Sequence, residues 1–148
     1  MKAIFTLLVL TILPLAGCTE SENPDDVLSC QVETVAGPED DVIGKWKMVW
    51  RKEINFSTGE KITDYSCNDI VFHFKPEGYL EVINDVEESE YSSGDYEYEF
   101  ILSPFHETME GYTLKINTLR WPCYINTNTL TLDASPVDGS TLHFVRME

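Results

Sequence analysis

Residues 70–78 read Ile-Val-Phe-His-Phe-Lys-Pro-Glu-Gly. Ile70, Phe72 and Phe74 alternate with other side chains, and this period of two is typical of a strand that buries one face. The Pro-Glu-Gly sequence that follows is a turn signal. Alternation followed by a turn recurs on both sides of this stretch, so we expect a chain built of short strands.

The alternation predicts eight strands, and no long window has helical spacing. Short connections between successive strands imply an antiparallel up-and-down meander, and eight strands suffice to close a small barrel and remove the sheet edges. We therefore predict an all-β domain over residues 42–148, with a loop at 55–68. The expected strands lie at 44–54, 69–75, 79–84, 95–101, 112–118, 120–126, 129–133 and 140–147.

The first and last strands of such a barrel lie side by side. Trp46 and Arg146 then both point inward at the end where the first strand begins, which we call the floor; the other end is the mouth. A guanidinium over an indole face is worth about 0.5–2 kcal/mol as a cation–π pair. The two side chains are therefore predicted to close the floor.

Gly44-Lys45-Trp46 resembles the Gly-x-Trp start of the lipocalin family, in which an Arg on the last strand covers the Trp. A wider set of segments resembles the small lipocalin-like lipoproteins of Bacteroidota. The resemblance implies a small lipocalin-like barrel with Trp46 and Arg146 in the closing roles, although the domain is shorter than a classical lipocalin. The matching segments are residues 43–49, 64–66, 70–78, 96–98 and 138–146.

The N-terminus reads as an export signal. Lys2 precedes an apolar run at 4–13 that is too short to span a bilayer, and Leu-Ala-Gly-Cys follows at 15–18. This looks like the lipobox of a bacterial lipoprotein, which implies that residues 1–17 are removed and that Cys18 is acylated and holds the chain at a membrane. An ordinary secretory signal is the alternative, and it also removes residues 1–17.

Residues 18–41 are expected to form the lipidated Cys and a flexible acidic tether, because their apolar content is low and no strand or helix period appears. The acids just after Cys18 resemble the surface-export signals of Bacteroidota lipoproteins. They imply an outer-membrane lipoprotein exposed at the cell surface. A merely solvated linker is the alternative.

The formal net charge is −16. Such a surface repels phosphates, which argues against a nucleic-acid partner. It favours a cationic ligand or a basic protein partner, with solubility alone as the other interpretation.

Cys30, Cys67 and Cys123 lie beyond the acylated residue, in a compartment that permits disulfides. Three thiols allow one bridge and one leftover. We favour Cys67–Cys123, because both lie in the folded region; a buried, inert Cys123 is the alternative. The spacings do not resemble a zinc site, and no cofactor is predicted.

Two uses of the mouth follow from strand parity. Inward aromatic and apolar side chains there would line a cup for a small apolar or amphipathic ligand, or else simply fill a small barrel. The acids of the neighbouring loop could hold Ca²⁺, although a solvated acidic loop is the default. The lining residues are Trp50, Ile70, Tyr96 and Trp121, and the acids are Asp85, Glu87, Glu88, Glu90 and Asp95.

We find no catalytic constellation. His73 and His143 have outward parity and His106 lies in a floor loop, so the histidines form no ligand set. We therefore expect a binding module and not an enzyme. The leading hypothesis is a lipid-anchored barrel with a ligand at its mouth; the alternative is a filled barrel that contacts another envelope or extracellular protein through acidic mouth loops.

Overall fold

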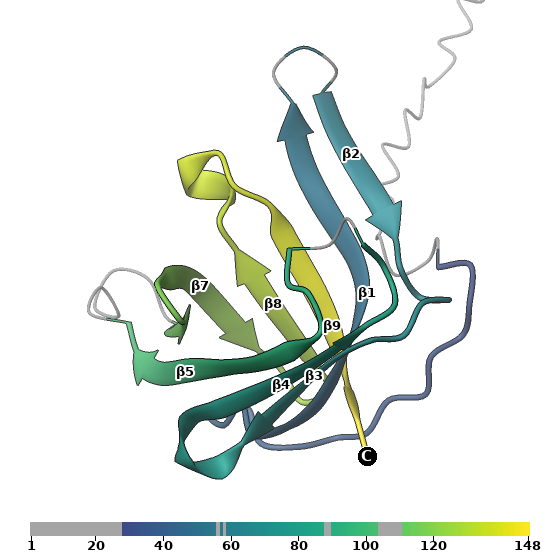
Figure 1. The fold of residues 1–148 in the computed structure, drawn as a ribbon. Coiled ribbons are helices and arrows are strands. Elements are labelled where there is room, and N and C mark those ends of the chain that lie inside the picture. Colours follow the sequence, from purple (N-terminus) through teal and green to yellow (C-terminus); the bar gives the residue numbers. More distant parts are fainter. Residues whose placement is uncertain (1–27, 56, 58, 88–89, 104–110) are drawn as a thin grey trace, which may run out of the picture.

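The computed structural model describes residues 28–55, 57, 59–87, 90–103 and 111–148. Nine antiparallel strands form one sheet in the described part of the chain (Figure 1). They are β1 (Gly44–Asn55), β2 (Gly59–Asp64), β3 (Ile70–Lys75), β4 (Tyr79–Asn84), β5 (Gly94–Leu102), β6 (Tyr112–Ile116), β7 (Leu119–Ile125), β8 (Thr129–Asp133) and β9 (Thr141–Met147). Two short 3₁₀ turns join them, η2 (Pro76–Gly78) and η3 (Ser135–Val137).

The sheet closes because β1 pairs with β9 as well as with β3. From β3 to β9 each strand pairs with the next one along the chain, so β1 and β3 to β9 form an eight-stranded antiparallel barrel. The predicted all-β meander and its closure are confirmed. Strand β3 shows the reason most clearly, since Ile70, Phe72 and Phe74 are buried in the core and the residues between them are partly exposed.

Strand β2 was not predicted. It lies in the expected loop at 55–68 and pairs with the second half of β1 outside the barrel. The two strands form a hairpin that projects beyond the mouth (Figure 1). Most side chains of β2 are exposed, so both of its faces meet water and no apolar alternation marks it in the sequence.

A β-bulge in β1 overturns the prediction for Trp50. Met48 pairs with Phe144 and Trp50 pairs with His143, so Val49 is an extra residue in the strand. One extra residue exchanges the two faces of the strand beyond it. Trp50 therefore lies on the outer wall and does not line the interior.

Residues 28–41, which we call the strap, are docked on the barrel and are not part of a flexible tether. The Val35 amide donates to the Arg146 carbonyl at 3.0 Å, and the Gly37 amide donates to the Thr127 carbonyl at 2.7 Å. In Figure 1 the strap runs down the outside of the barrel and passes the floor before β1 begins. Backbone hydrogen bonds to the barrel replace the solvation that the expected tether would have kept.

The upper part of the strap covers a small apolar cluster on the outer wall. Val49, Trp50 and Val145 are buried there, and Leu28 and Val32 of the strap pack against them. The bulge and the strap thus belong together, because the strap shields the tryptophan that the bulge turns outward. Such burial is worth about 25 cal/mol per Å² of apolar surface.

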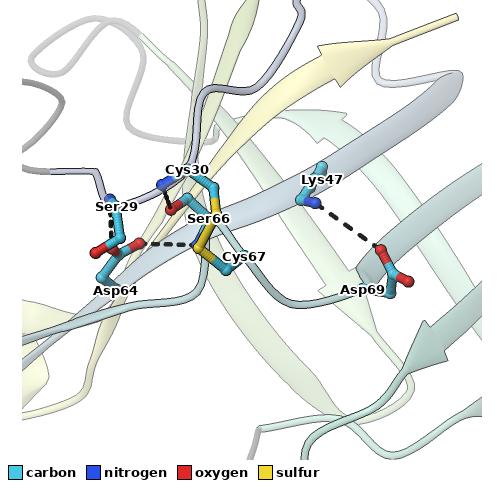
Figure 2. Close-up of a disulfide and its surroundings, with 7 residues drawn as sticks. All are labelled: Ser29, Cys30, Lys47, Asp64, Ser66, Cys67 and Asp69. Atoms are coloured by element: carbon cyan, nitrogen blue, oxygen red, sulfur yellow. Dashed lines mark hydrogen bonds and ion pairs between the residues drawn. A yellow bond between two sulfur atoms is a disulfide. The ribbon is translucent and has the colours of Figure 1, made fainter.

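The disulfide joins Cys30 to Cys67, so the favoured pairing of Cys67 with Cys123 is wrong. Docking of the strap brings Cys30 to the segment between β2 and β3, as Figure 2 shows. Cys123 is free and buried in the core. Burial raises the pKa of the Cys123 thiol to about 12, which fits the inert residue of the alternative interpretation.

Candidate functional site

The floor is closed by the first and last barrel strands. Trp46 and Arg146 are opposite each other in the β1–β9 register, and the guanidinium carbon lies 4.1 Å from the centre of the indole ring. Trp46 is fully buried, and its indole N–H donates to the Val42 carbonyl at 2.7 Å. The sequence thus placed this pair at the correct end of the barrel.

The strap covers the outer side of Arg146. The guanidinium donates to the Pro38 carbonyl at 2.6 Å and to the Asp41 carbonyl at 3.2 Å. Gly37 passes so close that a Cβ there would lie 2.7 Å from the Arg146 side chain. Neutral carbonyls and an aromatic face therefore contact this cation directly, and the Asp41 carboxylate acts on it through its charge.

The mouth is closed by a different kind of residue. Ile70, Tyr96 and Trp121 do come together near the mouth end of the interior, as predicted. Tyr91, which belongs to the loop between β4 and β5 and is 6% exposed, packs against Tyr96 and Trp121 there. The interior is thus filled by the protein's own side chains at the place where a cup was expected.

Tyr91 packs among three aromatic rings, its hydroxyl accepts a hydrogen bond from Trp121, and its carbonyl accepts one from the Asn84 side-chain amide at 2.5 Å. Its ring lies edge-on to Phe72 and to Tyr96, with ring centres 5.5 Å apart in both pairs. The Trp121 indole N–H donates to the Tyr91 hydroxyl at 2.8 Å. Burial raises the pKa of Tyr91 to about 12, and Glu90 acts in the same direction, so the phenol is neutral at physiological pH.

The rim beside Tyr91 carries an ion-pair group. One terminal nitrogen of Arg51 lies 2.8 Å from a Glu53 carboxylate oxygen and 3.4 Å from one of Glu90. The Ser140 hydroxyl also donates to Glu90 at 3.4 Å. Glu90 thereby links the loop of Tyr91 to β1 and to the start of β9. Its carboxylate is already engaged by Arg51 and Ser140.

The other proposed calcium ligands do not gather with Glu90 into a site. Asp85, Glu87 and Asp95 are exposed, and Glu88 lies outside the described residues. In the described part of the chain, no group of three or more His, Cys, Asp or Glu side chains could hold a metal ion. Asp85 and Glu87 instead border an open hollow of about 310 Å³ with Asn84 and Ser92.

The histidines of the barrel wall face outward, as their parity predicted. His143 stacks on Trp50 with ring centres 4.7 Å apart, and its Nδ1 shares a hydrogen bond of 2.9 Å with the Thr131 hydroxyl. His73 Nδ1 lies 3.7 Å from a Glu81 carboxylate oxygen. His106 lies outside the described residues.

Sequence reasoning missed Tyr91 and Arg51. The available signal for Tyr91 was that it is a single aromatic residue within the acidic loop 84–95. Burial of an aromatic ring removes a large apolar surface from water and is therefore favourable. The three successive apolar residues at 48–50 were the signal for the bulge, which also turns Arg51 toward the mouth.

No family model, curated protein or solved structure matches this chain. Cys18, the predicted acylation site, lies outside the described residues. Within the residues that the structure does describe, no helix has the length and apolar character needed to cross a membrane. The barrel and its two closed ends are therefore the structural basis for a functional proposal.

Proposed function

We propose that this chain is a lipid-anchored cell-envelope protein that acts by binding, and that it contacts a basic partner protein through its mouth. The observation that carries this proposal is the occupied mouth: Tyr91 fills the interior there, while Asp85 and Glu87 on the same loop face solvent. We call Asp85, Glu87 and Glu90 the acidic rim. A filled barrel leaves its surface as the place for recognition, and an acidic surface attracts basic partners.

The anchor in this proposal rests on Leu15-Ala16-Gly17-Cys18 and on the resemblance to lipocalin-like lipoproteins of Bacteroidota. The proposal also places the anchored domain at the cell surface, on an outer membrane. Cells fed with labelled palmitate should label the wild-type chain and not a Cys18→Ser variant, and the variant should leave the membrane fraction. Equal labelling of the two chains would overturn the anchor.

The acidic rim can be tested by reversing charge at two places. Asp85→Lys with Glu87→Lys changes the rim, and Glu77→Lys with Glu97→Lys, called the wall variant, makes the same charge change on exposed residues of the η2 turn and of β5, away from the rim. Used as baits on envelope extracts, the wild type and the wall variant should retain the same partner, and the rim variant should lose it. Loss from both variants would mean that only net charge matters.

A small apolar or amphipathic ligand at the mouth is a second candidate function. It is favoured by one observation: the residue that fills the mouth comes from a loop, whereas the rings around it come from barrel strands. Native mass spectrometry and tryptophan quenching would test it. Absence of a co-purifying ligand and of saturable quenching would leave the protein-partner function alone.

A further inference from the structure

The pocket around Tyr91 is built by the barrel and not by the loop. Phe72 lies on β3, Tyr96 on β5 and Trp121 on β7, and their ring centres lie 5.5–6.5 Å from that of Tyr91. Each of these strands is hydrogen-bonded on both sides within the closed sheet. The pocket walls are therefore fixed independently of the ring that occupies them.

One polar group of the pocket wall is the indole N–H of Trp121, which meets the Tyr91 hydroxyl. Trp121 is 4% exposed, and its N–H points to the Tyr91 hydroxyl at 2.8 Å. An indole N–H is only a donor, and a buried donor without an acceptor is unfavourable. An occupant of this pocket must therefore offer an oxygen at the place of the Tyr91 hydroxyl and a flat ring to Phe72 and Tyr96.

The loop itself has little else inside the barrel. Of its described residues, Tyr91 alone is buried, and Val86 is partly buried against the core. The loop is also held by polar contacts: the Asn84 side-chain amide donates to the Tyr91 carbonyl at 2.5 Å, and the Tyr96 hydroxyl donates to the Ser92 carbonyl at 2.8 Å. Asn84, Asp85 and Ser92 of the same segment border the open hollow. Exchange of one ring for another would thus leave the barrel strands unchanged.

We propose that Tyr91 occupies a binding site for a small phenol, a single aromatic ring with one hydroxyl, which enters by displacing the Tyr91 ring and accepts the hydrogen bond from Trp121. This inference rests on the small-ligand candidate function and names its ligand class. Because the side chain and the ligand compete for one pocket, the apparent affinity of the wild type is lowered by the fraction of molecules in which Tyr91 is seated.

The test uses the full chain with Tyr91→Ala and compares phenol with toluene, which has a methyl group in place of the hydroxyl. We expect phenol to bind the variant about tenfold or more tightly than it binds the wild type, because the internal competitor is gone. We also expect phenol to bind the variant at least about fivefold more tightly than toluene, because only phenol satisfies the Trp121 donor. Adding Trp121→Phe should abolish this preference.

Tyr98→Ala is the matched control. Tyr98 also lies edge-on to a core ring, Phe74, at 5.0 Å, and its hydroxyl also donates a hydrogen bond, to the Lys75 carbonyl at 2.8 Å, but it belongs to strand β5. Removal of Tyr98 should not create phenol binding. Equal gains in phenol affinity from the two variants would overturn the proposed site, since any lost tyrosine would then suffice.

The outcomes test two statements separately: that the ligand is a phenol, and that the mouth binds a small ligand at all. Equal binding of phenol and toluene to Tyr91→Ala would overturn the phenol assignment and keep the small-ligand candidate. No saturable binding of phenol, toluene or the apolar dye Nile red to either chain would overturn both. If the variant does not fold, phenol titrated into the wild type should shift the Trp121 indole N–H resonance, assigned with Trp121→Phe; an unmoved resonance would overturn the site.

Discussion

At the floor of the barrel, Trp46 and Arg146 come from strands that are hydrogen-bonded to each other, and closure of the sheet brings them together. At the mouth, Tyr91 comes from a loop and is held by ring contacts and by hydrogen bonds from the Trp121 and Asn84 side chains, without backbone pairing in the sheet. The floor cannot open without separating β1 from β9. The mouth can open while every barrel strand stays paired, so the two ends should differ in local stability.

The largest effect is expected from Trp46→Ala. It leaves a tryptophan-sized cavity among fully buried residues and removes the ring beneath Arg146, and it should lower the free energy of unfolding by about 3–5 kcal/mol. Denaturant unfolding of the variant and of the milder Trp46→Phe would measure it. A loss no greater than that of Tyr91→Ala would contradict the distinction between the two ends.

Loss of the disulfide should weaken the floor next. Cys30→Ser with Cys67→Ser opens a link between residues 37 positions apart and should lower stability by about 2–4 kcal/mol. Amide exchange should rise at Val35 and Gly37, whose hydrogen bonds hold the strap near Arg146. Cys123→Ser is the control for loss of a cysteine without loss of the bridge. Faster amide exchange at the mouth, without faster exchange along the strap, would contradict the prediction that the disulfide stabilises the floor through the strap.

Tyr91→Ala should cost less, about 2 kcal/mol, because a loop can settle into the vacated space more readily than paired strands can. Hydrogen exchange should increase around the β4–β5 loop and stay unchanged in β1 and β9. Tyr91→Phe keeps the ring and removes only the acceptor of the Trp121 hydrogen bond, so it should cost about 1 kcal/mol. The comparison of the two ends fails if β1 and β9 lose protection in the alanine variant.

The smallest effect concerns acid. Burial alone would raise the pKa of Asp64, but hydrogen bonds from Ser66 and Ser29 lower it to about 2. A lowered pKa means that the folded chain binds fewer protons than the unfolded chain, so the stabilisation is present above about pH 4 and is lost as the pH falls toward 2. The midpoint temperature of thermal unfolding falls between pH 5 and pH 2, and this fall should therefore be slightly smaller in Asp64→Asn than in the wild type. An identical fall in both chains would contradict this.

Period-two alternation predicted the barrel strands to within two residues at each end and the contact of Trp46 with Arg146. It worked because the inward side chains of strands such as β3 and β8 are buried while those between them are partly exposed. It failed at β2, where both faces meet water, and it failed past Val49, where one extra residue exchanges the faces of β1. The apolar run at 48–50 interrupts the alternation and is the sign of that bulge in the sequence.

Less of the candidate site could be predicted from the alternation of the sequence. Ile70, Tyr96 and Trp121 were assigned correctly to the mouth end of the interior, because parity along a regular strand is reliable. Tyr91 was not, because the path of a loop depends on which pocket its side chains can fill. The disulfide was missed for a similar reason, since Cys30 reaches Cys67 only after the strap has docked.

The position of the disulfide also decides how mechanical load would enter the domain. A pull on the chain before Cys30 passes through the sulfur atoms to Cys67, and so to the segment that connects β2 and β3. The strap from residue 31 to residue 41 lies outside this path and carries no tension while the bond is intact. Reduction would leave the same force on the hydrogen bonds from the Ser29 and Cys30 amides to Asp64 and Ser66, and then on the backbone hydrogen bonds of Val35 and Gly37.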